Sequence, residues 1–210
     1  MSTAVETIET ATGIPNGKLG IWLFLASEVM LFGGIISSYI VLRIGSPAFG
    51  MPPREMLGVP LAMINTFVLI TSSVTMVLAL ASIQKGNRNA FAGYLLATLF
   101  LGLVFLGIKA YEYHHKWAEG ITLSGSLFGS FYYTMTGLHA LHVIGGLVLN
   151  TYILTASLTP TLSLQGRGSK GEGWLGQITP EHHDRVEYAG LYWHFVDLVW
   201  VVLFPLLYLL

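Results

Sequence analysis

The chain has 210 residues, of which 53% are hydrophobic and 10% are charged, and its mean hydropathy is +0.66. Soluble domains usually carry about 25% charged residues, so this composition indicates an integral membrane protein. The formal net charge of −1 excludes a strongly basic nucleic-acid-binding protein. The lack of cysteine excludes disulfides, thiolate metal sites and a cysteine nucleophile.

The first 17 residues form a polar leader rich in Thr, Ala and Glu. This leader lacks the basic start of a signal peptide, so we expect the apolar run behind it to be retained as a membrane helix. The sequence therefore predicts a flexible leader at 1–17 and a single membrane domain at 18–210.

Five segments have the roughly 20 apolar residues that a hydrocarbon core of about 30 Å requires. They are residues 19–42, 57–83, 91–113, 127–156 and 188–210. Most connections are short, but the last contains the sequence GRGSKGEG and is expected to form a soluble cytoplasmic insert at about 157–187. The fold class expected is an all-α integral membrane protein, a bundle of five transmembrane helices.

Basic residues set the expected orientation, because cytoplasmic loops carry an excess of Lys and Arg. An arrangement with the N-terminus in the cytoplasm and the C-terminus on the outer side places the larger basic set inside. That set is Lys18, Lys85, Arg88, Arg167, Lys170 and Arg185, against Arg43, Arg54, Lys109 and Lys116 outside.

Glu28 is the unusual residue of the first span. It follows Lys18 by about 15 Å along a helix axis, near the middle of the bilayer, where inserting an acid costs about 2.5–3.5 kcal/mol. It is expected to be protonated unless a cation lies close, and a hydrogen bond to a neighbouring helix is the simpler alternative to a functional role. The small residues Ala26, Gly33 and Ser37 are expected to pack against another helix, which would turn Glu28 toward a cleft, a lipid or a partner chain.

Glu112 ends the third span in the sequence KAYEYHHKW. We expect it to lie close to water and to form an ion pair with Lys109 or Lys116.

The fourth span, FYYTMTGLHALHVIGGLVLN, combines an apolar composition with one polar side. At about 100° per residue, Leu141, Ile144 and Val148 fall on the side opposite to the polar one. Because hydrocarbon cannot satisfy polar groups, the polar side must face protein. Its members are Tyr132, Met135, Thr136, His139, His142, Gly146 and Asn150.

His139 and His142 have the same spacing as His194 and Asp197 in the last span, YWHFVDLVW. One hypothesis is a haem or metal site that uses these histidines. The other is an interhelical hydrogen-bonded knot in which His139 and His142 meet His194 and Asp197. The spacing alone leaves both hypotheses open.

A group of titratable residues precedes the last span on the expected cytoplasmic side. It is interpreted as a hydrated, proton-exchanging patch in preference to a surface metal site, because histidine exchanges protons near neutral pH. The alternative is that these residues only solvate and stabilise the start of a helix. The patch consists of Glu181, His182, His183, Asp184 and Glu187.

The motifs in chain order resemble subunit III of the haem–copper respiratory oxidases, in its short five-helix bacterial form. They are WLFLASEVMLFGG, PLAMINTFVLITSSVT, QKGNR, KAYEY, GSFYYTMTGLHALHV and HHDRVEYAGLYWHFVDLVW. The run Tyr192–Trp200 is the most specific part. Leu138 and Ala140 depart from the family pattern, in which Phe and Gly are commoner, and the insert before His182 is longer than usual.

The resemblance implies an accessory subunit that carries no cofactor or metal of its own, with haem and copper in the partner subunits I and II. It implies a place in the bacterial plasma membrane, bound phospholipid, stabilisation of the catalytic subunit I and support of proton uptake. The reaction would belong to the complex, in which electrons from cytochrome c or quinol reduce oxygen to water while protons cross the membrane.

The resemblance also favours the hydrogen-bonded knot over a metal. It assigns lipid-cleft or buried polar positions to Glu28, Glu112, His139, His142, Trp193, His194 and Asp197, and no catalytic residue. Two rival functions remain, an accessory subunit of a nitric-oxide reductase and a membrane haem electron carrier that uses His139 or His142 with His194.

Overall fold

The computed structural model describes residues 16–47, 49–50, 52, 57–158 and 184–209. Within this part of the chain the protein is all-helical, and five helices are long and apolar enough to cross a membrane, which confirms the predicted fold class. A π-helix, η3 (Pro205–Leu209), continues the last of them. The five are α1 (Asn16–Gly45), α2 (Val59–Gln84), α3 (Arg88–Ala118), α4 (Leu127–Leu158) and α5 (Asp184–Phe204).

Three helices extend beyond the predicted spans by three or more residues at one end or at both ends. Helix α1 begins at Asn16, inside the predicted leader, and α3 continues to Ala118 because its terminal charged residues pair within the protein. Helix α5 begins at Asp184, where acidic side chains in the first turn are stabilised by the positive end of the helix dipole. Apolar composition therefore located the spans but placed these ends too far inside the helices.

Helices α2 and α3 form a tight hairpin. The turn between them uses Gly86, whose φ of 75° is readily adopted only by glycine. The side chain of Asn87 then accepts a hydrogen bond from the backbone N–H of Ala90 at 3.1 Å, which caps the start of α3.

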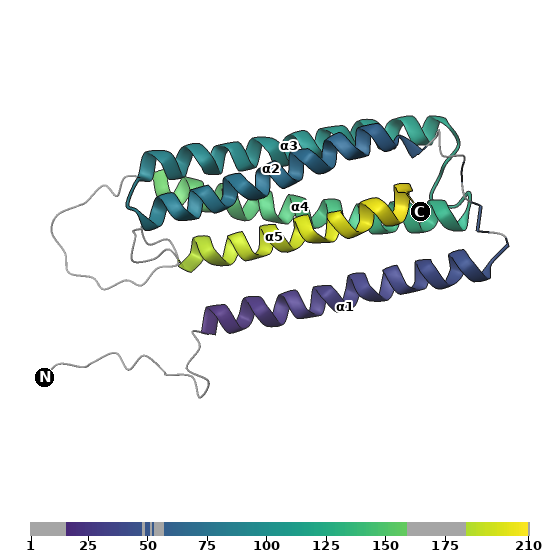
Figure 1. The fold of residues 1–210 in the computed structure, drawn as a ribbon, viewed down its shortest axis with the longest axis horizontal. Coiled ribbons are helices and arrows are strands. Elements are labelled where there is room, and N and C mark those ends of the chain that lie inside the picture. The colour runs from purple at the N-terminus through teal and green to yellow at the C-terminus, as the bar shows by residue number, and fades with distance from the viewer. Residues whose placement is uncertain (1–15, 48, 51, 53–56, 159–183, 210) are drawn as a thin grey trace, which may run out of the picture.

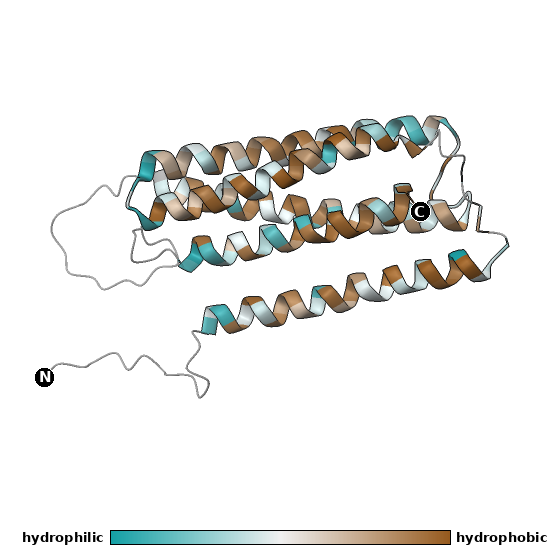
Figure 2. Cartoon of the chain, viewed as in Figure 1, coloured by the Kyte–Doolittle hydropathy of each residue, from teal (hydrophilic) through white to brown (hydrophobic). Residues whose placement is uncertain are grey.

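Helices α2 to α5 form a four-helix body, and α1 runs along one side of it (Figure 1). Helix α1 packs against α4 and α5, and less extensively than the body helices pack against one another. In the most apolar stretch of the last span 50% of the residues are buried, against 11% for α1. Figure 2 shows hydrophobic residues along most of every helix and many of the hydrophilic ones near the helix ends. Thus α5 is central, and α1 presents most of its surface outward.

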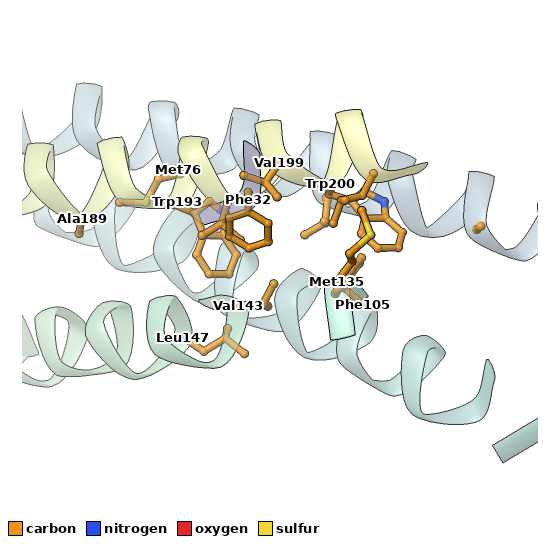
Figure 3. Packing of buried hydrophobic residues seen from close by; sticks show 14 of the residues in the cluster. Phe32, Met76, Phe105, Met135, Val143, Leu147, Ala189, Trp193, Val199 and Trp200 are labelled. Atoms are coloured by element: carbon orange, nitrogen blue, oxygen red, sulfur yellow. The ribbon is translucent and has the colours of Figure 1, made fainter. Parts of the chain in front are cut away.

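Trp193 fixes the spacing of the body helices. Its indole lies between Gly102 of α3 and Gly146 of α4, where an added Cβ would approach the ring to 2.9 Å and 2.6 Å. Its Nε1–H donates a hydrogen bond to the hydroxyl of Ser72 on α2 at 3.1 Å. In Figure 3 the ring points from α5 toward α4, beside Val143. The small glycines allow the close helix approach that membrane bundles require.

The polar side of α4 faces the protein, as predicted. Tyr132, Thr136, His139 and Asn150 are almost fully buried, whereas the opposite side is exposed at Leu141, Ile144 and Val148.

Candidate functional site: polar groups within the membrane helices

The largest polar assembly is an ionic cluster of Lys109, Glu112, Lys116, Tyr132 and Tyr208. Its acid and bases lie on one side of α3, because residues three and four apart share a helix face. The Nζ of Lys109 lies 2.9 Å from Oε2 of Glu112, and the Nζ of Lys116 lies 2.9 Å from Oε1. The three charged residues are at most 3% exposed, and two lysines against one glutamate leave a formal excess of one positive charge.

Two tyrosines complete this cluster. The hydroxyls of Tyr132 and Tyr208 each donate to Oε1 of Glu112, at 3.0 Å and 2.7 Å. The two lysines also donate hydrogen bonds to groups other than Glu112. Lys109 donates to the hydroxyl of Tyr208 at 2.7 Å, and Lys116 donates to the carbonyl of Leu57 at 3.0 Å. The cluster therefore ties α3 to α4, to η3 and to the segment before α2.

The ion-pair partners predicted for Glu112 are correct, but its predicted position close to water is wrong. Both predicted lysines pair with it, but the group lies inside the protein and not close to water. The cause is the aromatic residues of α4, α5 and η3, which cover it. The ammonium of Lys116 lies 4.3 Å from the ring centre of Tyr132, and that of Lys109 lies 4.6 Å from the ring centre of Trp200.

Glu28 reaches across from α1 to α4, where its Oε2 lies 3.0 Å from Nε2 of His142. The other ring nitrogen, Nδ1, lies 2.8 Å from the carbonyl of Leu138 and can only donate to it. Nε2 of a neutral ring must then accept from a protonated Glu28, and Nε2 of an imidazolium donates to a carboxylate. In both cases one proton is shared between the two side chains. They are only 14% and 16% exposed.

The predicted packing face of α1 is wrong. Ala26 and Ser37 are exposed, and a Cβ added at Gly33 would meet nothing within 4 Å. The side of α1 that carries Glu28 and Phe32 is the one that packs against the body. Small residues guide packing only where two backbones come close, and here a hydrogen-bonding partner on α4 decided the orientation.

The predicted knot of four residues is also wrong. His139 is fully buried, stacks on Trp200 with ring centres 5.1 Å apart, and meets the edge of Phe105. Neither its ring nitrogens nor the carboxylate oxygens of Asp197 have a hydrogen-bond partner among the described residues. His142 turns instead to α1. Residues three apart differ in direction by about 60°, which is enough to send two histidines of one helix toward different neighbours.

His194 and Asp197 lie on the seam between α2 and α5. Nδ1 of His194 is hydrogen-bonded to the hydroxyl of Ser73, which also lies near the Asp197 carboxyl group. Sequence reasoning overlooked Tyr208, because a single tyrosine carries no periodic signal.

No group of three or more His, Asp or Glu side chains in the described ranges converges as a metal site would require. The imidazoles of His142 and His194 are engaged by Glu28 and Ser73, on different helices. These two histidines therefore do not form one of the two pairs that the haem-carrier hypothesis allowed; the other pair was His139 with His194.

The proton-exchanging patch is described only in part. Glu181, His182 and His183 lie outside the described residues. Asp184 and Glu187 stand in the first turn of α5, where Oε1 of Glu187 accepts a hydrogen bond from Nζ of Lys18 at 2.9 Å. This ion pair links the start of α1 to the start of α5.

The fold and these groups define the class: a multi-span membrane protein whose interior polar side chains mostly serve contacts between helices. Residues 4–210 match the family described as cytochrome c oxidase subunit III, and the chain belongs to this family.

Curated relatives extend over nearly the whole chain. Cytochrome c oxidase subunit 3 of Alkalihalophilus pseudofirmus is 35% identical over 215 residues, which cover 97% of this chain and 96% of the relative. Quinol oxidase subunit 3 of Bacillus subtilis is 34% identical, covering 100% and 94%. Cytochrome bo(3) ubiquinol oxidase subunit 3 of Pseudomonas aeruginosa is 32% identical, covering 93% and 85%.

Proposed function

We propose that this chain is the accessory subunit III of a proton-pumping haem–copper terminal oxidase in a bacterial plasma membrane, with its N-terminus in the cytoplasm. The match to the subunit III family over residues 4–210 carries the proposal. In the proposed oxidase, subunits I and II hold haem and copper, and the complex reduces oxygen to water. The electron donor is cytochrome c or quinol, since relatives are named as oxidases of both kinds.

The contribution of this chain is structural support of subunit I. The ionic cluster and the Trp193 contact hold α2 to α5 in one arrangement, so the body can present a constant surface to a partner. None of its own residues is assigned to oxygen chemistry.

Phospholipid is the second proposed ligand. An apolar cavity of about 360 Å³ lies between α1, α4 and α5, lined by Ile21, Ile153 and Ala189 among others, with Arg185 among its lining residues. An acyl chain suits the apolar lining, and a basic side chain suits an anionic headgroup. Exchanging Ala156, which also lines the cavity, for Trp should lower the amount of lipid retained through purification. Equal retention by the variant would contradict this assignment.

Support of proton uptake is assigned to Glu181, His182, His183, Asp184 and Glu187. Histidine has an ordinary pKa of about 6.5, so a pair of histidines can pass protons to an entrance near neutral pH. If the patch supplies protons, His182→Asn combined with His183→Asn should slow turnover increasingly above pH 7, with the complex fully assembled. If turnover follows the parent across that range, the patch only stabilises the start of α5.

The proposal as a whole is tested by purifying the complex through a tag on this chain. The expected preparation contains a haem–copper catalytic subunit and consumes oxygen with reduced cytochrome c or with quinol. When this chain is deleted, the oxidase purified through a tag on its catalytic subunit should lose activity during turnover. Recovery of a nitric-oxide-reducing complex instead would overturn it. So would a haem Soret band from the isolated chain, which the electron-carrier alternative requires.

A further inference from the structure

Glu28 of α1 and His142 of α4 can form their hydrogen bond only while the pair holds a proton. The carbonyl of Leu138 accepts from Nδ1 of His142 at 2.8 Å, so the hydrogen of a neutral ring lies on Nδ1. Nε2 and the carboxylate of Glu28, which are 3.0 Å apart, are then two facing acceptors unless one of them is protonated. Removal of the shared proton therefore turns an attraction between α1 and α4 into a repulsion.

The neighbouring side chains do not offer a donor in place of this proton. The basic residues of α1 nearest to Glu28 are Lys18 and Arg43, which lie about 15 Å and 22 Å away along the helix axis. On α5, the ring of Tyr192 lies beside that of His142, but its hydroxyl hydrogen is donated to the backbone carbonyl of His142.

Other titratable side chains of α4 and α5, the helices that pack against α1, have neighbours of their own. His139 of α4 stacks on Trp200. On α5, His194 lines the groove beside α1 but is bonded through Nδ1 to the hydroxyl of Ser73, and the buried Asp197 lies near that same hydroxyl. Among the described residues, none of these groups is hydrogen-bonded to Glu28, so the link between α1 and α4 at this depth depends on its own proton.

The apolar cavity between α1, α4 and α5 lies two helical turns from the pair. Ile21 precedes Glu28 by seven residues, Leu149 follows His142 by seven, and both line the cavity. Seven residues are two turns less about 20°, so each wall residue shares the helix face of its member of the pair and lies about 10 Å from it. The separation of the two walls therefore depends on whether Glu28 and His142 attract or repel each other.

We propose that the proton shared by Glu28 and His142 is a pH-sensitive clamp that controls lipid exchange in this cavity. While the proton is present, α1 is held against α4 and a bound acyl chain exchanges slowly. When rising pH removes the proton, the carboxylate is left without a donor inside the membrane, which is costly, so α1 moves away from α4 and the cavity opens. This inference rests on the proposed function, because it takes phospholipid as the occupant of the cavity, and it adds what regulates that site.

The first test is phospholipid exchange in the purified oxidase. The complex is incubated with deuterated phosphatidylglycerol, and bound lipid is followed by mass spectrometry from pH 6 to pH 9.5, a range that ends below the ordinary pKa of tyrosine, about 10. Exchange that persists in Ala156→Trp is subtracted, because Ala156 lines the cavity. In the parent, exchange should become about five- to tenfold faster as the pH rises, as expected for the loss of one polar contact between membrane helices.

Glu28→Gln is the decisive variant. Its amide can donate to a neutral imidazole and accept from an imidazolium, so the link persists at every pH and exchange should change less than about twofold. Tyr192→Phe is the matched control, because it removes a neighbouring titratable group and leaves the pair intact, so it should keep the parental response. A parent without a response to pH would overturn the inference. So would a Glu28→Gln variant that responds like the parent, or a Tyr192→Phe variant that has lost the response.

Thermal unfolding of the chain within the complex tests the clamp without reference to lipid. The link is present at low pH and is lost as the pH rises, so the melting temperature of the parent should fall by about 2–4 °C relative to that of Glu28→Gln. A difference between the two proteins that is constant from pH 6 to pH 9.5 would overturn the clamp. If the melting temperatures diverge as expected but no phospholipid occupies the cavity at any pH, the lipid assignment of the proposed function has failed, which is a different outcome.

Discussion

The four-helix body and α1 are joined by very different kinds of polar contact. Inside the body, the ionic cluster gives Glu112 four donors from α3, α4 and η3, and every participant is buried. Helix α1 is instead held by separate links along its length. These are Lys18 to Glu187, Glu28 to His142, and Tyr39 and Arg43 to the carbonyl of Leu206.

The two kinds of contact differ in what the removal of one partner costs. Removing one member of the cluster leaves the others buried and unpaired, whereas the links of α1 through Lys18 and Glu28 involve partly exposed groups. Polar contacts between membrane helices are worth about 0.6 kcal/mol on average, with a maximum of about 1.7 kcal/mol. The body should therefore behave as one cooperative unit, and α1 as an element whose position adjusts to lipid or to a partner.

The largest effect is expected from Glu112→Gln. The substitution leaves the ammonium groups of Lys109 and Lys116 buried without a counter-charge, which should lower the free energy of unfolding by about 3–5 kcal/mol. Thermal or SDS-induced unfolding of the purified protein measures it. Glu119→Gln is the control, because Glu119 forms its ion pair with the exposed His115. If both variants unfold like the parent, the cluster does not hold the body together.

A smaller effect is expected where a methyl group is added to the packed body. Gly102→Ala places a Cβ 2.8 Å from Leu147 and 2.9 Å from Trp193, and overpacking of this kind costs about 1–3 kcal/mol. Gly33→Ala on α1 meets nothing within 4 Å and should not destabilise the protein. Comparing the unfolding free energies of the two variants tests whether the body is more tightly packed than α1. Equal losses of stability would contradict this difference.

Glu28 should give a still smaller change in stability. Glu28→Gln keeps a group that can hydrogen-bond to His142, so assembly should be largely intact. Glu28→Ala removes the link in the middle of α1 and should cost no more than about 1.7 kcal/mol of unfolding free energy. We expect it to lower lipid retention and the number of turnovers before inactivation. An alanine variant that retains lipid and activity like the parent would show that this link does not position α1.

The smallest effect is expected from Lys18→Gln. The ion pair with Glu187 is partly exposed on both sides, so it is screened by salt and its loss should leave unfolding unchanged within error. Proteolysis at the start of α1 is the finer measurement, and the variant should be cut faster at low salt than the parent. A large loss of thermal stability would show that the Lys18–Glu187 pair contributes as strongly as a contact of the ionic cluster, which would contradict the prediction.

Sequence reasoning succeeded for features that depend on one helix and the bilayer. It found the five spans, the inward side of α4 and the lysine partners of Glu112, which are three and four residues away on the same helix. It failed for contacts between helices. His142 pairs with Glu28, which is 114 residues away in the chain, and no local pattern connects the two.

The sequence by itself determined that the chain crosses the membrane five times and that its polar side chains must be turned to protein, because hydrophobic length and the lack of donors in hydrocarbon act on each segment separately. Only the tertiary structure decided which polar group meets which. Spacings of three residues leave a difference of about 60° in direction, and the distances between helices depend on side chains such as Trp193 that wedge between them. For the same reason, His139 came to lie against Trp200 while His142 reached α1.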